Sequence, residues 1–275
     1  MSQNTLQVTR DRGVVRVVID NPPVNVLSLA LMGELRTLLA NLREDEDARV
    51  VVFESADPEF FLAHVDFTLV DDANAKGDPT AGAPEGLNVF QAVGEALREL
   101  PQVSIVKLTG LARGGGAEFV TAADLTFAAI GTAGLGQIEA IGGIVPGGGG
   151  TQYLLNRVGR NRALEIVLGA DLFDAETAER YGWINRALPA DEIDAFVDRI
   201  ARNIADLPEG TIAAAKHALP PDDLAAGMLR EHQAWAGQFV KPAAEKLIRG
   251  GLAVGVQTRE GERDLEGLMR SVLAG

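Results

Sequence analysis

The sequence predicts an α/β core followed by a helical appendage, and three patterns support this fold class. Short apolar runs rich in valine, at residues 49–55 and 103–108, are typical of strands in a sheet that helices cover on both faces. Amphipathic helical segments alternate with the strands up to about residue 150. Beyond that point the pattern is almost entirely helical, which indicates that helices follow the sheet instead of interleaving with it.

The N-terminal elements follow from alternation, turn residues and a helix cap. Residues 6–19 predict two strands joined by a turn at residues 11–13, and a rigid loop containing two prolines follows at residues 20–25. Ser28 is a suitable N-cap for a helix that runs to about residue 42, because leucines recur along one face of that segment.

A long loop precedes the central strand. Residues 71–86 are rich in Asp, Gly, Pro and Ala, and loops of this length in compact domains are often lids or mobile segments. We therefore expect a mobile loop there. A helix at residues 87–100 then leads into the strand at residues 103–108.

Three consecutive glycines, at positions 114–116, separate that strand from an apolar helix that begins near Ala117. Their uncovered N–H groups and the positive end of the helix dipole suit an anion, or a carbonyl oxygen that becomes anionic during a reaction. Glu118 lies in the first helical turn, beside those amides. The alternative is a tight turn with a solvated glutamate, and the glycines alone do not decide between the two.

The second half of the chain begins with a short strand at residues 125–129 and a glycine-rich stretch at residues 142–152. Four glycines before a helix resemble a phosphate-binding loop, but the lysine of a Walker loop is missing, which disfavours that function. A nucleophile elbow of the GxSxG type is also missing. One short extended piece is expected at residues 182–186, with helices at residues 190–206, 209–219, 222–239, 241–253 and 258–273.

Composition excludes several classes of protein. The formal net charge is −14, with 39 acidic against 25 basic residues among 275, which disfavours nucleic acid as a partner. The absence of cysteine excludes disulfides, thiolate metal sites and cysteine nucleophiles. The three histidines are too scattered to predict a metal site. Because we find no signal peptide and no apolar run long enough for a membrane, we expect a soluble cytoplasmic protein.

Six short segments match one family in their order and spacing. They are residues 21–27, 61–66, 114–118, 136–139, 146–152 and 178–185. Together they resemble the enoyl-CoA hydratase/isomerase (crotonase) superfamily over nearly the whole chain. The resemblance implies a spiral of strand–strand–helix turns with an acyl-CoA site over residues 1–188. It also implies a C-terminal helical region, residues 189–275, that builds homotrimers, often paired into hexamers.

The chemistry that the resemblance implies is stabilisation of an enolate formed from an acyl-CoA thioester. The N–H groups of Val65 and Gly115 would hold the thioester oxygen, in agreement with the oxyanion site predicted at the glycines. Glu118 and Glu139 match the two glutamates of family members that hydrate a double bond. Hydration needs a base for water and an acid for the α-carbon, so we assign Glu118 to water activation and Glu139 to proton transfer. The alternative is that either glutamate only caps a helix.

Coenzyme A enters this chemistry as part of the substrate, and the resemblance implies no separate cofactor and no metal. Further binding residues expected from the resemblance lie in four stretches of the chain. They are Val24, Asn25, Val26, Ala63, His64, Asp66, Arg113, Gly114 and Gly142. Lys241, Lys246 and Arg249 are candidates for the CoA phosphates, although a charged helix face is also explained by solvation alone.

Four features depart from the family pattern. His64 stands where glycine is usual, and either lines the acyl pocket, contacts CoA or packs within its loop. Val65 is bulkier than the usual alanine. Arg113 replaces an apolar residue and either balances Glu118, meets an anionic acyl group or lies on the surface. One extra residue separates Glu118 from Glu139, which affects where Glu139 lies.

The sequence therefore predicts a lyase that hydrates trans-2-enoyl-CoA to 3-hydroxyacyl-CoA, a reaction of fatty acid metabolism. Two alternatives stay open. One is another crotonase-type reaction on an acyl-CoA, by an isomerase, hydrolase, decarboxylase or C–C lyase. The other is a CoA-binding paralogue without turnover. The apolar stripe that contains Ile193, Phe196, Val197 and Ile200 fits either packing within the domain or a trimer interface.

Overall fold

The computed structural model describes residues 4–71, 80 and 82–275. The loop predicted at residues 71–86 therefore lies largely outside the described residues. Within the described part of the chain, the helices are all too short or too polar to cross a membrane.

A six-stranded sheet forms the centre of the molecule, in the order β1-β2-β3-β5-β7-β10. The hairpin of β1 and β2 is antiparallel, and each of the other neighbouring pairs is parallel. Valine-rich strands occupy the interior positions because both of their faces are covered. The bounds are β1 Leu6–Asp11, β2 Val14–Ile19, β3 Val50–Ser55, β5 Val103–Leu108, β7 Leu125–Ala129 and β10 Arg186–Leu188.

A second, smaller sheet has the order β4-β6-β8-β9. Its strands are β4 Phe60–Leu62, β6 Leu111–Arg113, β8 Gly134–Gly136 and β9 Phe173–Asp174. Strands β4, β6 and β8 each follow a strand of the large sheet, and a helix follows each pair in the chain. This repeated strand–strand–helix order confirms the crotonase-like α/β spiral that the resemblance implied.

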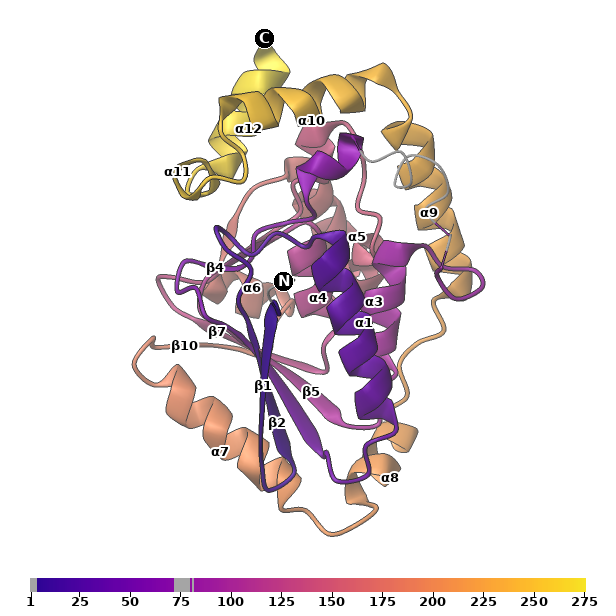
Figure 1. Ribbon diagram of the computed structural model, residues 1–275, viewed down its shortest axis with the longest axis vertical. Coiled ribbons are helices and arrows are strands. Elements are labelled where there is room, and N and C mark those ends of the chain that lie inside the picture. The colour runs from indigo at the N-terminus through magenta and orange to yellow at the C-terminus, as the bar shows by residue number, and fades with distance from the viewer. Residues whose placement is uncertain (1–3, 72–79, 81) are drawn as a thin grey trace.

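Helices α1 (Leu29–Arg43), α3 (Val89–Arg98), α4 (Gly115–Ala122) and α5 (Gly150–Gly169) pack around the two sheets (Figure 1). Ser28 caps α1 as predicted, accepting a hydrogen bond from the N–H of Leu31. A short helix, α6 (Ala175–Tyr181), precedes β10. The extended piece expected at residues 182–186 is mostly a turn, and the strand begins only at Arg186.

Helix α7 (Ile193–Ala205) packs on strands β2, β3, β5 and β7. Ile193 and Val197 are fully buried in the main core, and Phe196 lies edge-on to Phe127 with ring centroids 5.0 Å apart. The predicted apolar stripe therefore packs within the chain. The oligomeric state that the resemblance implied stays a prediction.

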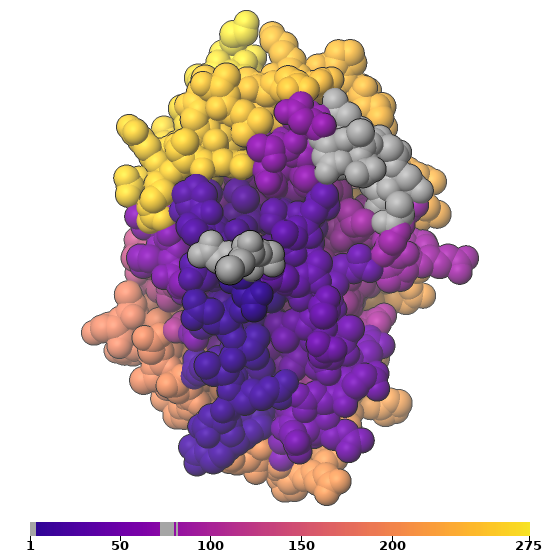
Figure 2. All heavy atoms as spheres, in the orientation of Figure 1, coloured from indigo at the N-terminus to yellow at the C-terminus, as the bar shows by residue number. Residues whose placement is uncertain are grey.

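The remaining helices are α8 Thr211–Ala218, α9 Ala225–Phe239, α10 Pro242–Val254, α11 Arg259–Glu262 and α12 Leu265–Ala274. The single helix expected at residues 258–273 is split, because Asp264 breaks the helix and caps α12 through the N–H of Gly267. Helices α10 and α12 pack on the 3₁₀ turn η2 (Glu139–Gly142) of their own chain, and α10 also contacts the 3₁₀ turn η1 (Phe67–Asp71). Figure 2 shows this yellow C-terminal region directly against the indigo N-terminal segment.

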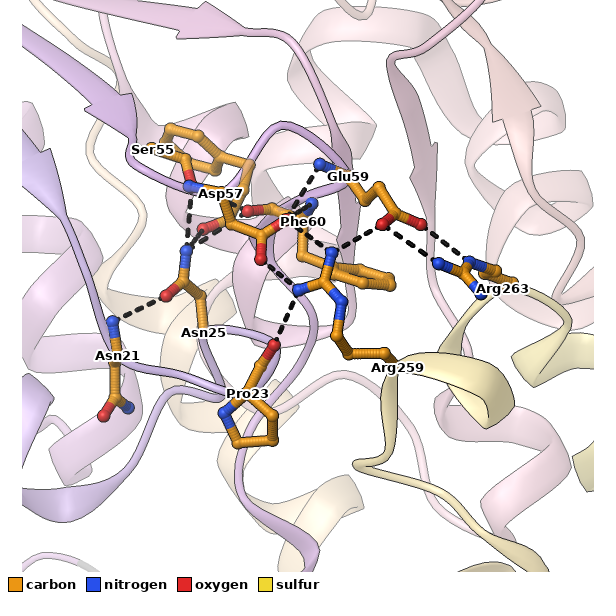
Figure 3. A network of polar contacts seen from close by, with 10 residues as sticks. Asn21, Pro23, Asn25, Ser55, Asp57, Glu59, Phe60, Arg259 and Arg263 are labelled. Carbon is orange, nitrogen blue, oxygen red and sulfur yellow. Dashed lines mark hydrogen bonds and ion pairs between the residues drawn. The ribbon is translucent and has the colours of Figure 1, made fainter.

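A polar network joins α11 to the N-terminal loop (Figure 3). Arg259 donates to the carbonyl oxygen of Pro23 at 3.0 Å, pairs with Asp57 and lies over the ring of Phe60. Arg263 pairs with Glu59, with 2.7 Å between Nε and Oε2. The C-terminal segment is thus attached to its own chain at several points.

Candidate active site

A cavity opens between the loop after β4, the start of α4, the turn η2 and helices α9 and α10. It encloses about 780 Å³, including its open mouth. Eight of the residues predicted from the sequence line it: His64, Val65, Asp66, Gly114, Gly115, Glu118, Glu139 and Gly142. The rest of its wall is mostly apolar.

The start of α4 requires glycine for steric reasons. Gly114 has φ 49° and ψ −126°, a backbone conformation that side chains disfavour. A Cβ atom on Gly116 would lie 2.1 Å from the carbonyl oxygen of Leu62, so α4 can approach strand β4 only without a side chain there. The glycines therefore bring the helix N-terminus against the loop that contains Val65.

The N–H groups of Val65 and Gly115 are uncommitted, since neither donates a hydrogen bond within the described residues. Val65 forms a parallel β-bridge with Leu27. In this bridge the backbone of Leu27 makes hydrogen bonds to the residues on either side of Val65. This pairing leaves the N–H of Val65 directed away from Leu27. A Cβ on Gly115 would lie 2.5 Å from Cγ2 of Val65, so the two residues are direct neighbours at the cavity wall.

Glu118 is nearly fully buried, and its Oε1 accepts hydrogen bonds from the N–H groups of Gly148 at 2.8 Å and Gly150 at 2.9 Å. Burial raises the pKa of Glu118 well above its usual value, and the nearby Glu139 and Glu231 raise it further. The two N–H groups oppose that rise because they stabilise the anion.

Glu231, on α9, is a buried carboxylate that the sequence analysis missed. It accepts hydrogen bonds from the N–H groups of Gly149 at 2.6 Å and Thr151 at 2.9 Å. A signal was present, because Glu231 lies between Met228 and Trp235 on the apolar face of its helix. Four consecutive N–H groups at the start of α5 therefore donate hydrogen bonds to two glutamates. This glycine-rich stretch binds carboxylates of its own chain and is not a phosphate-binding loop.

Glu139 begins the turn η2 and is partly exposed to the cavity. Burial raises its pKa to about 8, with a further contribution from the charge of Glu231. The side-chain amide of Gln137, turned with its nitrogen toward Glu139, donates to Oε2 at 2.9 Å. The extra residue between Glu118 and Glu139 does not separate them, since both line the same cavity.

The structure contradicts two of the three alternatives predicted for Arg113. This residue is neither on the surface nor beside Glu118, because its fully buried guanidinium makes two hydrogen bonds to Glu266 of α12, at 2.6 and 2.9 Å. His64 lines the cavity and is also packed within its loop. Its Nε2 lies 2.9 Å from Oε1 of Glu262, which is also fully buried.

The residues expected near CoA adenine are enclosed by protein. Val24, Val26 and Ala63 form a small apolar cluster with Phe60, and the side chain of Asn25 bonds to Ser55 and to backbone carbonyls. Their role in binding CoA stays a prediction. Lys241, Lys246 and Arg249 are exposed, and Arg249 pairs with Asp71 and Glu245.

Comparison with known proteins places the chain in a family. Residues 9–259 match the family model described as enoyl-CoA hydratase/isomerase. A crystal structure of a "putative enoyl-CoA hydratase" from Streptomyces avermitilis is 64% identical, with a TM-score of 0.97 and all of both chains covered. An enoyl-CoA hydratase structure from Bacillus anthracis is 29% identical, with a TM-score of 0.69 and coverage of 91% of this chain and 95% of that one. A "probable enoyl-CoA hydratase" of Mycobacterium bovis is 28% identical over 243 residues, which are 87% of this chain and 91% of that protein. The chain therefore belongs to the enoyl-CoA hydratase/isomerase (crotonase) family.

Proposed function

We propose that this protein hydrates trans-2-enoyl-CoA thioesters to 3-hydroxyacyl-CoA. The observation that carries the proposal is that Glu118 and Glu139 line one cavity together with two uncommitted N–H groups. Each part matches a need of the reaction, which adds water across a double bond conjugated to a thioester carbonyl.

The thioester oxygen is the place where negative charge develops when water attacks the β-carbon. The N–H groups of Val65 and Gly115 would receive that oxygen. Loss of one such donor typically costs about 10²–10³ in rate, because donors held in place need no reorganisation during the reaction.

The two glutamates divide the proton transfers. Two carboxylates near each other in a buried site share a proton near neutral pH, because both cannot ionise without repulsion. We assign Glu118 as the base for water, because two N–H groups stabilise its charged form against the rise in pKa that burial causes. Glu139, with a pKa raised to about 8, keeps a proton at neutral pH and delivers it to the α-carbon.

The cavity wall favours an apolar acyl group. Phe90, Trp235 and Phe239 form an aromatic wall, with Trp235 stacked on Phe239 at 4.9 Å between ring centroids. Among the described residues that line the cavity, the charged ones are Asp66 and glutamates, and no lysine or arginine is present. We therefore expect uncharged acyl chains to be preferred over chains with a second carboxylate.

We also expect a homotrimer or a hexamer. Leu164 and Leu168, one turn apart on α5, are 39% and 65% exposed, as an apolar face covered in an assembly would be. Sedimentation at micromolar concentration tests this, and a monomer would contradict it.

The function is tested by the loss of conjugated ultraviolet absorbance when the protein is added to short and medium trans-2-enoyl-CoA. We expect hydration, and incorporation of one solvent deuterium at the α-carbon in D₂O. A protein that binds CoA thioesters and exchanges α-protons without adding water is an isomerase-type enzyme, and one that does neither is a non-catalytic paralogue. Either result would overturn the proposal.

A further inference from the structure

Four ionisable side chains lie buried behind the cavity wall, where α11 and α12 meet the ends of β4 and β6. His64, Arg113 and Glu262 are at most 1% exposed, and the side chain of Glu266 is 13% exposed. His64 pairs with Glu262 and Arg113 pairs with Glu266, while Nη1 of Arg113 lies 3.9 Å from Oε2 of Glu262. We call these four residues the C-terminal clamp.

Stability alone does not explain the clamp. Removing charges from water costs several kcal/mol per ion, and well-packed apolar residues in place of a buried ion pair are often neutral or stabilising. A buried pair of this kind does fix geometry, since each partner has only one satisfactory position. The question is therefore which part of the molecule the clamp holds in place.

One pair holds the first donor loop. Nδ1 of His64 lies 2.7 Å from the carbonyl oxygen of Val65, and Nε2 lies 2.9 Å from the carboxylate of Glu262. Both ring nitrogens thus lie within hydrogen-bonding distance of an oxygen atom. The ring bridges the residue with the uncommitted N–H to the C-terminal helices.

The other pair holds the second donor. Arg113 ends strand β6 two residues before Gly115, and its guanidinium makes a two-point contact with Glu266. Such a planar contact restricts both position and orientation. The segment that presents the N–H of Gly115 is therefore attached to α12 as the Val65 loop is attached to α11.

A strained residue adds a third attachment. Gln257, in the turn before α11, has φ 70°, which is uncommon for a residue with a side chain. Its side chain accepts from the N–H of Phe67 at 2.6 Å and donates to Asp66 at 3.0 Å, while its own N–H donates to Glu262 at 2.8 Å. The turn is thus bonded to both the Val65 loop and the clamp.

We propose that the C-terminal clamp positions the two thioester-oxygen donors, with His64 and Arg113 as positioning residues and Glu262 and Glu266 as their anchors. The inference rests on the proposed function only in taking the N–H groups of Val65 and Gly115 as donors. It gives the C-terminal helices a part in catalysis that is separate from any part in assembly.

The test uses acetoacetyl-CoA, whose enolate absorbs in the near ultraviolet. Its enolisation on the protein requires donors at the thioester oxygen but no addition of water, so it reports on the donors independently of hydration. The saturated thioester butyryl-CoA is the probe for ground-state binding. The variants are His64→Gln, Glu262→Gln and their double variant, with Arg113→Gln, Arg113→Lys and Glu266→Gln as an independent set in case the first set does not fold.

Arg263→Gln is the matched control. It removes an ion pair of the same C-terminal segment, but that pair is exposed and joins Glu59 instead of a donor loop (Figure 3). We expect clamp variants to lose enolate formation by up to about 100-fold, the cost of misplacing reacting groups by about 1 Å. Butyryl-CoA affinity should change little, the double variant should be no worse than the single ones, and Arg113→Lys should recover part of the loss that Arg113→Gln shows.

Three results would overturn the inference. One is unchanged enolate formation in folded clamp variants. Another is an equal loss of butyryl-CoA affinity and enolate formation, which would mean a merely structural role. The third is a wild-type protein that fails to form the enolate. A wild type that forms the enolate in a clamp-dependent way but does not hydrate enoyl-CoA would support the clamp and overturn only the proposed function.

Discussion

Two buried charged clusters border the same cavity, and they differ in the sign of the charges that surround each carboxylate. On one side Glu118, Glu139 and Glu231 lie together, and burial and mutual repulsion raise the pKa of each of the first two. On the other side burial would raise the pKa of Glu262, but His64 and Arg113 outweigh it and hold that pKa below its usual value. Carboxylates in the first cluster can exchange protons near neutral pH, whereas Glu262 stays an anion and serves as an anchor.

The largest expected effect on activity comes from removing a carboxylate from the cluster of Glu118, Glu139 and Glu231. Glu118→Gln keeps an oxygen to accept the two N–H groups of the glycine-rich stretch but cannot act as a base. We expect hydration to fall by about 10²–10⁴, the usual contribution of a general base. Thermal unfolding should be little changed, because the hydrogen bonds persist. A large loss of folded protein would instead mean that Glu118 is chiefly structural.

The two clusters should also give opposite pH dependences of stability. The folded-state pKa of Glu139 is raised, from 4.5 to about 8, so the folded protein holds a proton that the unfolded chain has lost. Its contribution to stability is complete below about pH 4.5 and is lost as the pH rises to about 8. The folded-state pKa of Glu262 is lowered, so its contribution is present above its unfolded pKa and is lost as the pH falls through the folded value.

Urea unfolding measured across a range of pH separates these two pH dependences of stability. Glu139→Gln should reduce the loss of stability on the alkaline side, to which Glu118 also contributes, and Glu262→Gln should reduce the loss on the acid side. If Glu139→Gln instead altered the loss of stability at acid pH, and Glu262→Gln the loss at alkaline pH, the comparison between the clusters would be wrong.

A smaller effect is expected from a change in helix α4, which contributes residues to both sides of the cavity. Helix α4 presents both Gly115 and Glu118, and it approaches β4 at Gly116. Gly116→Ala should destabilise the protein by about 1–3 kcal/mol through overpacking against the carbonyl of Leu62. Gly33→Ala is the control, because Gly33 lies on an exposed helix face with nothing near its Cβ position, and it should stabilise by about 0.5–1 kcal/mol. Equal effects of the two changes in urea unfolding would contradict the close approach.

The smallest effect is expected from the exposed pair of Arg263 and Glu59. Solvent screens such a pair, so Arg263→Gln should change stability little and leave hydration unaltered. A loss comparable to that of Glu262→Gln in unfolding experiments would mean that burial does not distinguish the two attachments of the C-terminal segment.

Local patterns were sufficient for most of the fold. The valine-rich strands and the Ser28 cap depend on neighbouring residues, and they appear where the sequence predicted them. The helix predicted to begin near Ala117 is also present, but it begins two residues earlier, at Gly115. The cavity residues Glu118 and Glu139 were also found, through motif spacing. The four strands of the second sheet, β4, β6, β8 and β9, were missed because each is only two or three residues long and has no local pattern.

Partners distant in the chain could not be predicted. Arg113 and Glu266 are 153 positions apart, and His64 and Glu262 are 198 apart. Periodicity does not show that α11 and α12 fold back on β4 and β6, so the two departures at His64 and Arg113 looked unrelated. A charged residue on an otherwise apolar helix face, as at Glu231, was the one available signal of a buried polar contact.

The central claim is that a pair of carboxylates shares one proton beside two oxyanion donors, and the pH profile of kcat/KM for enoyl-CoA hydration tests it most directly. The free enzyme should lose activity with an apparent pKa near 8 as Glu139 loses its proton, and again at lower pH when both carboxylates are protonated. Glu139→Gln should abolish the alkaline limb together with most of the activity. A profile that is flat across pH 6–9, or an alkaline limb that persists in Glu139→Gln, would contradict the account.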